Sequence, residues 1–504
     1  MSICYIYMKS IKNLPLITRA NAAMVTSFIF PIGNRLTLSS YALVTMRKIN
    51  VIVFEDRIHA VLTSLGEAAI AQIIDLRERT ERWPEVLAPY VFSMTREKEE
   101  KSEEPEVVAS HELSEGEKQI MQAEEKLART ARTVYFEAWV PDEHVKQAVD
   151  LINKSALGQC VVTDQLPAEG EKAPILLKPV PSFLAAFERL VYAFGYPSSG
   201  DINPVIILAF TFPILFGIMF ADVGQGLLFV AIGILLTLAK RKVRMDKVGD
   251  IIKYLFIGSE MFILLGISAT FFGFVFGEFF GPSGLIHPIS LGQIGPFRIG
   301  GFEPTQEPME MLRFAILVGA LHLALGLILR FVNEIRHRHY RLAPVPIFWL
   351  WLLFGGLEMW ASYGGISNIS KWFSVGIFMM MALIMLPLTL ILVFTGLAEG
   401  FTEGVGFSVE VFAETLSHTM SYGRLMALGL IHSAMNYLFL VLGGVEHGNF
   451  PLGSIPIIAV GTMLVLIIEG LVVFVHTLRL HWVEWFSKFH SGEGIAFKPF
   501  QLTK

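Results

Sequence analysis

From residue 204 to residue 486 the chain alternates long apolar stretches with short polar loops. About 20 apolar residues suffice for a helix to cross a bilayer. The first stretch, 204–239, is too long for one crossing, and the turn-prone segment Asp222–Gly226 divides it into two. The pattern therefore predicts about eight transmembrane helices, the last two long and tilted. The remaining six predicted spans are 251–277, 312–333, 343–363, 372–398, 405–443 and 452–486.

A different pattern precedes the apolar region. Short β-prone runs alternate with amphipathic segments between residues 46 and 200, which predicts a small cytoplasmic α/β domain. Its expected strands and helices are strands at 48–54, 69–76, 133–140 and near Cys160, and helices at 55–65 and from 141 to about 153.

Two further segments, one within this domain and one before it, show a different pattern. Residues 95–132 are dense in Glu and Lys and predict a charged, shortened coiled-coil arm. Residues 1–45 are weakly patterned, and we interpret them as a start-site extension or disordered segment ahead of Met46. A signal peptide is the alternative, but Pro31 breaks its short apolar run.

Composition agrees with a membrane protein. Only 17% of the 504 residues are charged and the mean hydropathy is +0.55, whereas soluble domains carry about 25% charged residues. Cys4 and Cys160 fit no disulfide framework and no metal spacing, and no nucleotide-binding loop is present. We therefore expect no catalytic site, no metal, no cofactor and no nucleic-acid partner.

Lysine and arginine are distributed unevenly over the predicted loops, and such residues favour the cytoplasmic side. The predicted outer loops hold Arg298 and Lys371. Both termini are therefore expected in the cytoplasm, with the transmembrane region at 201–487 and a tail at 488–504. The cytoplasmic loops and tail carry Lys240, Arg241, Lys242, Arg244, Lys247, Lys253, Arg330, Arg336, Arg338, Arg341, Lys488, Lys498 and Lys504.

Arg424 is the most informative residue. It is the only Arg, Lys or carboxylate between Glu414 and Glu446, and a charge within a bilayer is costly unless it has a function. At 100° per residue one helix face collects six polar residues over roughly 33 Å, which matches the hydrocarbon thickness of about 30 Å. These residues are Glu410, Glu414, Ser417, Ser421, Arg424 and His432.

The last span offers a shorter polar arc formed by Glu469, His476 and Arg479. Simpler interpretations stay open: Ser417 and His476 can bond a neighbouring helix, and Glu414 can lie at the interface. The other intramembrane polar residues are isolated and fit helix packing, and His337–His339 fits a basic loop better than a metal site. The isolated residues are Asp222, Glu260, Glu278, His322 and Glu358.

Four motifs give the chain a family resemblance. Ser417–Leu430, read as SHTMSYGRLMALGL, resembles the signature of membrane subunit a, or I, of V-type and archaeal A-type rotary ATPases. Phe212–Gly226, Glu469–Phe489 and Gly492–Phe500 resemble three other motifs of that family, so the likeness covers about 133–504. Gln225 and Gly423 depart from the usual residues, and the soluble part is roughly half the usual length.

The resemblance implies a stator that moves H⁺ or Na⁺ through two half-channels and couples this movement to rotation of a proteolipid c/K ring. By resemblance, Arg424 acts on the ring carboxylates with help from Arg479. Glu469 and His432 line the outer half-channel, and Glu410 and Glu414 the cytoplasmic one. Further implied partners are peripheral-stalk subunits, contacted through the N-terminal domain, and the central-stalk C/d subunit. The resemblance also implies that this chain lies in the cell membrane. The ion and the direction, ATP synthesis or pumping, stay open.

Two other functions remain as alternatives. The first is a secondary cation or proton transporter in which Arg424 and Glu469 form a gating pair, although the first four spans do not resemble the last four. The second is an intramembrane hydrolase, for which we find no recognisable nucleophile context.

Overall fold

The computed structural model describes two regions, an N-terminal α/β domain and a set of apolar helices. The described residues are 45–76, 115–130, 132–167, 171–176, 180–198, 200–240, 242–243, 249–363, 369–374, 376–445 and 451–502. The segment 1–44, which holds the predicted start-site extension, lies outside them.

The N-terminal domain is built on an antiparallel sheet with the strand order β2-β4-β1-β5, and β3 pairs with β4. Its long strands occur where alternation predicts them. In β1, Ile49, Val51 and Val53 are at most 1% exposed, whereas Ile52 and Phe54 are each 45% exposed, as expected for a sheet with one buried face. The strands are β1 Met46–Phe54, β2 Gln72–Ile73, β3 Ala128–Arg129, β4 Thr133–Pro141 and β5 Cys160–Gln165.

Three helices supply the other side of the core: α3 (Ile58–Ala68), α5 (Glu115–Glu124) and α6 (Val145–Ser155). In α5, Ile120 and Ala123 are buried in the same core as β1. The predicted coiled-coil arm is therefore not confirmed, because this part of it packs against the domain. Residues 95–114 of the expected arm lie outside the described residues.

The C-terminal tail also contributes to the N-terminal domain. The backbone amides of Phe500 and Leu502 donate to the carbonyls of Ala71 and Gly66 at 2.8 and 3.2 Å, and both side chains pack against the core. The tail that follows the last helix thus completes a domain that begins at β1.

Helices occur in all eight apolar segments predicted above. Seven are long and apolar enough to span a membrane, and α8 (Val205–Met219) is a shorter apolar helix of 15 residues. Four predicted spans contain more than one helix. In two of them shorter helices come first: α10 (Asp250–Ile257) precedes α11, and α14 (Ile369–Ser374) and α15 (Ile377–Met380) precede α16. The last two predicted spans hold α17 with α18 and α19 with α20. The remaining helices are α9 Val223–Lys240, α11 Ser259–Phe276, α12 Pro308–Arg336, α13 Val345–Tyr363, α16 Leu386–Glu399, α17 Phe401–Ser421, α18 Gly423–Leu442, α19 Ile455–Leu464 and α20 Gly470–Arg479.

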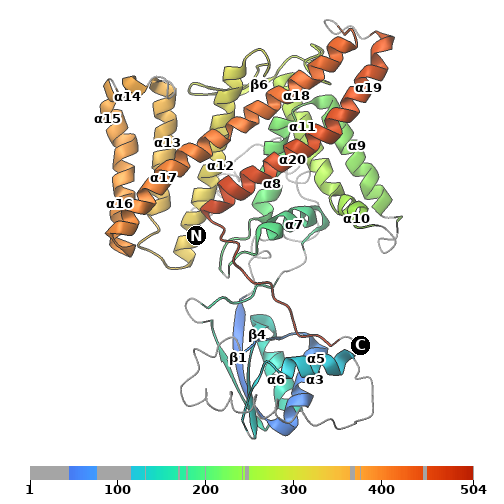
Figure 1. Ribbon diagram of the computed structural model, residues 1–504, viewed down its shortest axis with the longest axis vertical. Coiled ribbons are helices and arrows are strands. Elements are labelled where there is room, and N and C mark those ends of the chain that lie inside the picture. The colour runs from blue at the N-terminus through green and yellow to red at the C-terminus, as the bar shows by residue number, and fades with distance from the viewer. Residues whose placement is uncertain are drawn as a thin grey trace, which may run out of the picture. The chain divides into compact units, whose positions relative to one another are not determined.

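The last two helical runs, Phe401–Leu442 and Ile455–Lys488, are the longest among the described residues. Phe401–Leu442 forms one apolar run of 42 residues that is interrupted only at Tyr422, between α17 and α18. At ~1.5 Å per residue it is roughly 63 Å long, about twice the hydrocarbon thickness. Figure 1 shows α17–α18 and α19–α20 running obliquely, whereas α12 and α13 are steeper.

The final helix contains two π-helical segments, Val465–Glu469 and Leu480–Trp485. A π-turn inserts an extra residue into the helical repeat and is frequent at functional sites. Both segments end at or beside a carboxylate, Glu469 and Glu484, so they change the direction in which these side chains leave the helix.

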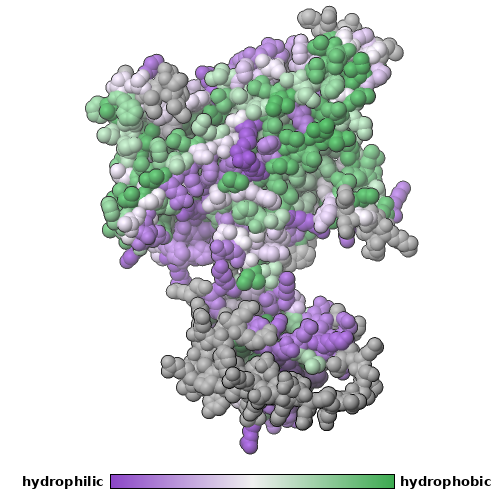
Figure 2. Space-filling view, viewed as in Figure 1, coloured by the Kyte–Doolittle hydropathy of each residue, from purple (hydrophilic) through white to green (hydrophobic). Residues whose placement is uncertain are grey.

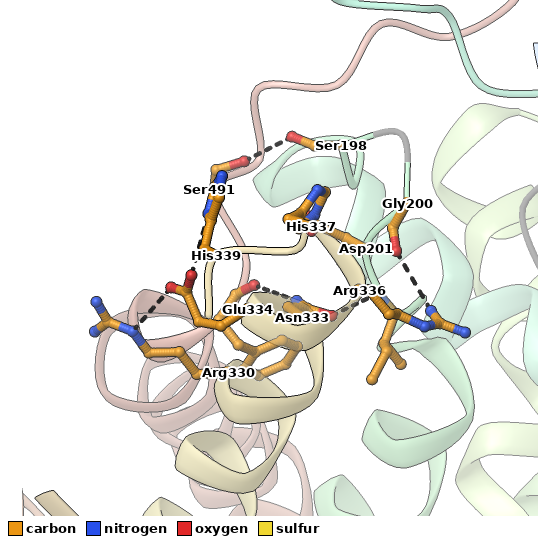
Figure 3. Close-up of polar contacts among 12 residues, drawn as sticks. Ser198, Gly200, Asp201, Arg330, Asn333, Glu334, Arg336, His337, His339 and Ser491 are labelled. Atoms are coloured by element: carbon orange, nitrogen blue, oxygen red, sulfur yellow. Dashed lines mark hydrogen bonds and ion pairs between the residues drawn. The ribbon is translucent and has the colours of Figure 1, made fainter. Parts of the chain in front are cut away.

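The end of α12 joins three parts of the chain (Figure 3). The Asn333 side chain accepts a hydrogen bond from the amide of Ile202 at 3.2 Å and donates one to the carbonyl of Phe489 at 3.1 Å. His337 lies 2.8 Å from Asp201, and His339 lies 3.2 Å from Glu334. The segment before α8 and the end of the last helix are thereby attached to α12.

Helices α9 and α11 cross at very short range. A Cβ built on Gly266 would lie 2.6 Å from the carbonyl oxygen of Gly226 and 2.7 Å from the amide of Val230. Small residues permit such close backbone approach in membrane helices, so this crossing cannot accept a side chain without moving apart.

We expect Gly266→Ala to destabilise the protein, because overpacking costs about 1–3 kcal/mol. Gly356→Ala is the matched control, since a Cβ there meets no atom within 4 Å and alanine favours a helix over glycine by about 1 kcal/mol. Thermal unfolding in detergent should show opposite signs for the two variants. Equal effects would contradict the crossing described here.

Candidate functional site

Arg424 is the second residue of α18 and lies next to the break at Tyr422. Its Nη2 donates a hydrogen bond to Ser421 Oγ at 3.3 Å. Its Nη1 lies 3.3 Å from Glu484 Oε1, and the two side chains are 22% and 1% exposed. The partly buried guanidinium therefore has a carboxylate counterion within the same chain.

Glu484 is the residue that the sequence analysis missed. It was part of a motif, but its position on a uniform helix gave no reason to pair it with Arg424. Glu484 lies within the π-helical segment Leu480–Trp485, which follows α20. The altered helical repeat of this segment changes the direction of the Glu484 side chain, which contacts Arg424. A carboxylate within an otherwise apolar span was the available signal.

A second polar group surrounds His432. The Nδ1 of His432 lies 3.1 Å from Glu469 Oε2, and its Nε2 lies 3.1 Å from Asn436 Nδ2. Gln225 Nε2 donates to Asn436 Oδ1 at 2.7 Å. The amide thus donates to Nε2, so that Nδ1–H is left to donate to Glu469. His432 and Glu469 are thus in direct contact, and an amide chain from α9 that the sequence did not indicate supports the other side of the His432 ring.

Asp222 and Glu278 lie beside this group. Atoms of Asp222, Glu278 and His432 approach one another within 4.8 Å, which is compatible with a metal ion in donor type. The Asp222 carboxylate, however, already accepts hydrogen bonds from the amides of Gln225, Phe280 and Gly281 at 2.9, 3.1 and 2.6 Å. Asp222 therefore caps α9 and holds the turn after α11, as its interpretation as a packing residue predicted.

Glu278 follows α11 and its side chain is almost fully buried. Burial raises its pKa to about 8, and the nearby Asp222 carboxylate acts in the same direction, whereas His432 opposes it. A carboxyl group with this pKa is protonated at neutral pH, so it can both donate and accept a proton in this range.

The other end of the polar face has a different chemistry. Glu414 forms an ion pair with Lys488, whose ammonium also lies 4.3 Å from the centre of the Trp349 ring. Arg330 stacks over the same ring at 5.6 Å. Glu410 is exposed. Lys488, which the sequence places at the start of the tail, is buried, and its partner Glu414 is half-buried.

The side chains of the remaining predicted residues are more exposed. Arg479 is exposed and His476 is half-buried on α20, while Ser417 is exposed on α17. The predicted gating pair of Arg424 and Glu469 is not formed, because Glu469 contacts His432 and Arg424 contacts Glu484. Thus the single polar face divides into an Arg424 group, a His432 group and a Glu414 group.

The face of the long helices around these groups is apolar. Figure 2 shows hydrophobic residues over much of the helical region, interrupted by polar ones. An exposed apolar surface of this kind indicates contact with lipid or another protein. Exposed large residues on α17–α20 include Val409, Phe412, Leu416, Met420, Ile431, Leu438, Leu471 and Val475.

Known proteins resemble this chain in both the N-terminal domain and the apolar helices. The sequence profile of the V-type ATPase 116 kDa subunit family matches residues 71–288 and 401–502. Proteins called A-type ATP synthase subunit I from Methanocaldococcus jannaschii and Pyrococcus horikoshii are each 29% identical to this chain, over 80% and 90% of its length. The vacuolar proton translocating ATPase 100 kDa subunit of Dictyostelium discoideum is 24% identical over 64% of the chain.

The chain is shorter than these relatives. The alignments span 60%, 71% and 52% of the Methanocaldococcus, Pyrococcus and Dictyostelium proteins, respectively.

We expect the Glu278 carboxyl to be protonated at neutral pH and to lose its proton near pH 8, because burial raises its pKa to about 8. Infrared difference spectroscopy should show the C=O stretch of a protonated carboxyl that disappears with that midpoint. Glu278→Gln should remove the band, and Glu260→Gln should leave it.

The same shift makes stability depend on pH. Unfolding restores the usual pKa of 4.5, so the unfolded chain binds fewer protons between pH 4.5 and about 8. The free energy of unfolding should therefore fall as pH rises through this window. A carboxyl band that titrates near pH 4.5 would contradict the assignment.

Proposed function

The chain belongs to the V-type ATPase 116 kDa subunit family, and from this premise we propose that it is the stator membrane subunit of a rotary ATPase. It has no catalytic site of its own in this proposal. It moves H⁺ or Na⁺ between two half-channels and a rotating ring of proteolipid subunits. The movement is coupled to ATP synthesis or hydrolysis on other subunits.

One observation carries the proposal: a permanently charged guanidinium lies between two separate ionisable groups on one long helical run. Arg424 is 14 residues from Glu410 and 8 residues from His432, or roughly 21 and 12 Å along a helix. An arginine does not lose its proton under physiological conditions. It can therefore separate two paths for a cation while each path remains open to one side.

The chemistry of the ring follows from desolvation. A ring carboxylate must be neutral, protonated or ion-bound, while it faces lipid, because an isolated charge there is very costly. Beside Arg424 the ionised form is favoured, and the ion is released. The apolar face of α17–α20 would provide the surface past which the ring moves.

The two groups flanking Arg424 then serve as the half-channels. His432 and Glu469 belong to the outer one, and the raised pKa of Glu278 suits a proton-exchanging group beside them. Glu410 and Glu414 belong to the cytoplasmic one. Ser421 positions Arg424, while Arg479 and His476 from α20 add positive charge and polarity near the ring.

The remaining assignments concern the surroundings. The chain would lie in the cell membrane with both termini in the cytoplasm, as the distribution of Lys and Arg over the loops favours. Its partners would be the proteolipid ring, the central-stalk C/d subunit and peripheral-stalk subunits bound through the N-terminal domain.

We expect Arg424→Ala to abolish ATP-driven ion pumping in the assembled complex, because no fixed charge then drives release from the ring. The measurement is ion uptake into vesicles that contain the purified complex. Arg341→Ala is the control, since Arg341 is an exposed loop residue and its loss should leave uptake unchanged.

Intact Arg424→Ala complexes that still pump would disprove the proposed role. Ion transport by the isolated chain in vesicles would favour a secondary transporter instead.

A further inference from the structure

Arg424 has two sides. On the inner side it faces Glu484, which is 1% exposed, whereas the arginine side chain itself is 22% exposed. The carboxylate therefore lies behind the guanidinium, away from the accessible surface. A second carboxylate can approach from the open side without displacing the first, because a guanidinium carries five N–H donors in a planar fork.

The contact with Glu484 is loose. The separation of 3.3 Å meets the distance of an ion pair, but Nη1 has no aligned hydrogen-bond partner among the described residues. Strong arginine–carboxylate pairs are bidentate at about 2.8 Å. Glu484 Oε2 likewise has no hydrogen-bond partner in the described part of the chain. The arginine is neutralised without having its donors saturated.

This arrangement addresses a conflict in the proposed mechanism. Arg424 must attract each ring carboxylate strongly enough to release its ion, yet it must also let that carboxylate leave. An unpaired guanidinium in an apolar site would hold the first carboxylate it meets, because such pairs interact strongly at low dielectric. A standing negative charge behind the arginine weakens that hold.

Resting on the proposed function, we infer that Glu484 is a resident counterion that makes the binding of ring carboxylates to Arg424 reversible. It compensates the arginine whenever no ring carboxylate is present. When one arrives, the two carboxylates share one positive charge, and their mutual repulsion favours reloading of the ring carboxylate with its ion. Glu484 is thus a positioning and charge-balancing residue and does not itself transport the ion.

The test is Glu484→Gln in the assembled complex, measured as ATP-driven pumping against ion concentration. Removing this charge stabilises the ionised ring carboxylate beside Arg424, so reloading should need more ion. One nearby charge shifts such an equilibrium about tenfold or more. With H⁺ the alkaline limb of the pH profile should move about one unit lower, and with Na⁺ the half-saturating concentration should rise about tenfold.

Two variants serve as controls. Glu358→Gln removes an exposed membrane-helix carboxylate that bonds Ser362 and should leave the ion dependence unchanged. Glu484→Asp keeps the charge one methylene farther away and should shift the dependence in the same direction by a smaller amount. Because Glu484→Gln also leaves a partly buried arginine without its counterion, its yield should be low and should recover in the double variant Arg424→Gln with Glu484→Gln.

The outcomes separate the two proposals. If Arg424→Ala abolishes pumping but Glu484→Gln, normalised to intact complex, keeps the wild-type ion dependence, the counterion role is wrong and the proposed function stands. If the Gln complex cannot be isolated, an unshifted Glu484→Asp profile overturns the inference. If Arg424→Ala still pumps, the proposed function fails first.

Discussion

The structure depends on accommodating one positive charge that cannot be neutralised by losing a proton. Arg424 lies within an apolar helical run, and a buried ion without a partner costs several kcal/mol. Glu484 reaches it from the last helix, and Ser421 contacts it from the adjoining turn. The close association of α18 with the final helix therefore has an electrostatic purpose in addition to apolar packing.

The polar side chains at the two ends of the polar face are stabilised by different interactions. Around His432 the polar atoms are joined by hydrogen bonds through Asn436 and Gln225, in addition to the contact with Glu469. Around Glu414 the groups are charged, and Lys488 and Arg330 lie over the Trp349 ring. Such cation–π contacts compensate part of the lost hydration.

Periodicity predicted much of the fold, because apolar length and strand alternation are local properties. It placed β1, β4 and all eight helical segments, and it brought Arg424, Ser421 and His432 onto one helical run. It could not predict Glu484 as the partner of Arg424, because two π-helical segments change the register that a uniform repeat assumes. It also missed the packing of α5 against the domain core and the amide chain from Gln225, since both depend on contacts between distant segments.

The C-terminal tail has a consequence for biosynthesis. The amide of Lys498 bonds the side chain of Gln72, which precedes it by 426 residues, and Phe500 and Leu502 complete the same core. At a translation rate of ~5–20 residues per second, the ribosome needs roughly 20–90 s to make the intervening chain. The core of this domain is thus completed only after the tail has been made, and during that interval its unfilled part is a surface that a chaperone can occupy and a protease can probe.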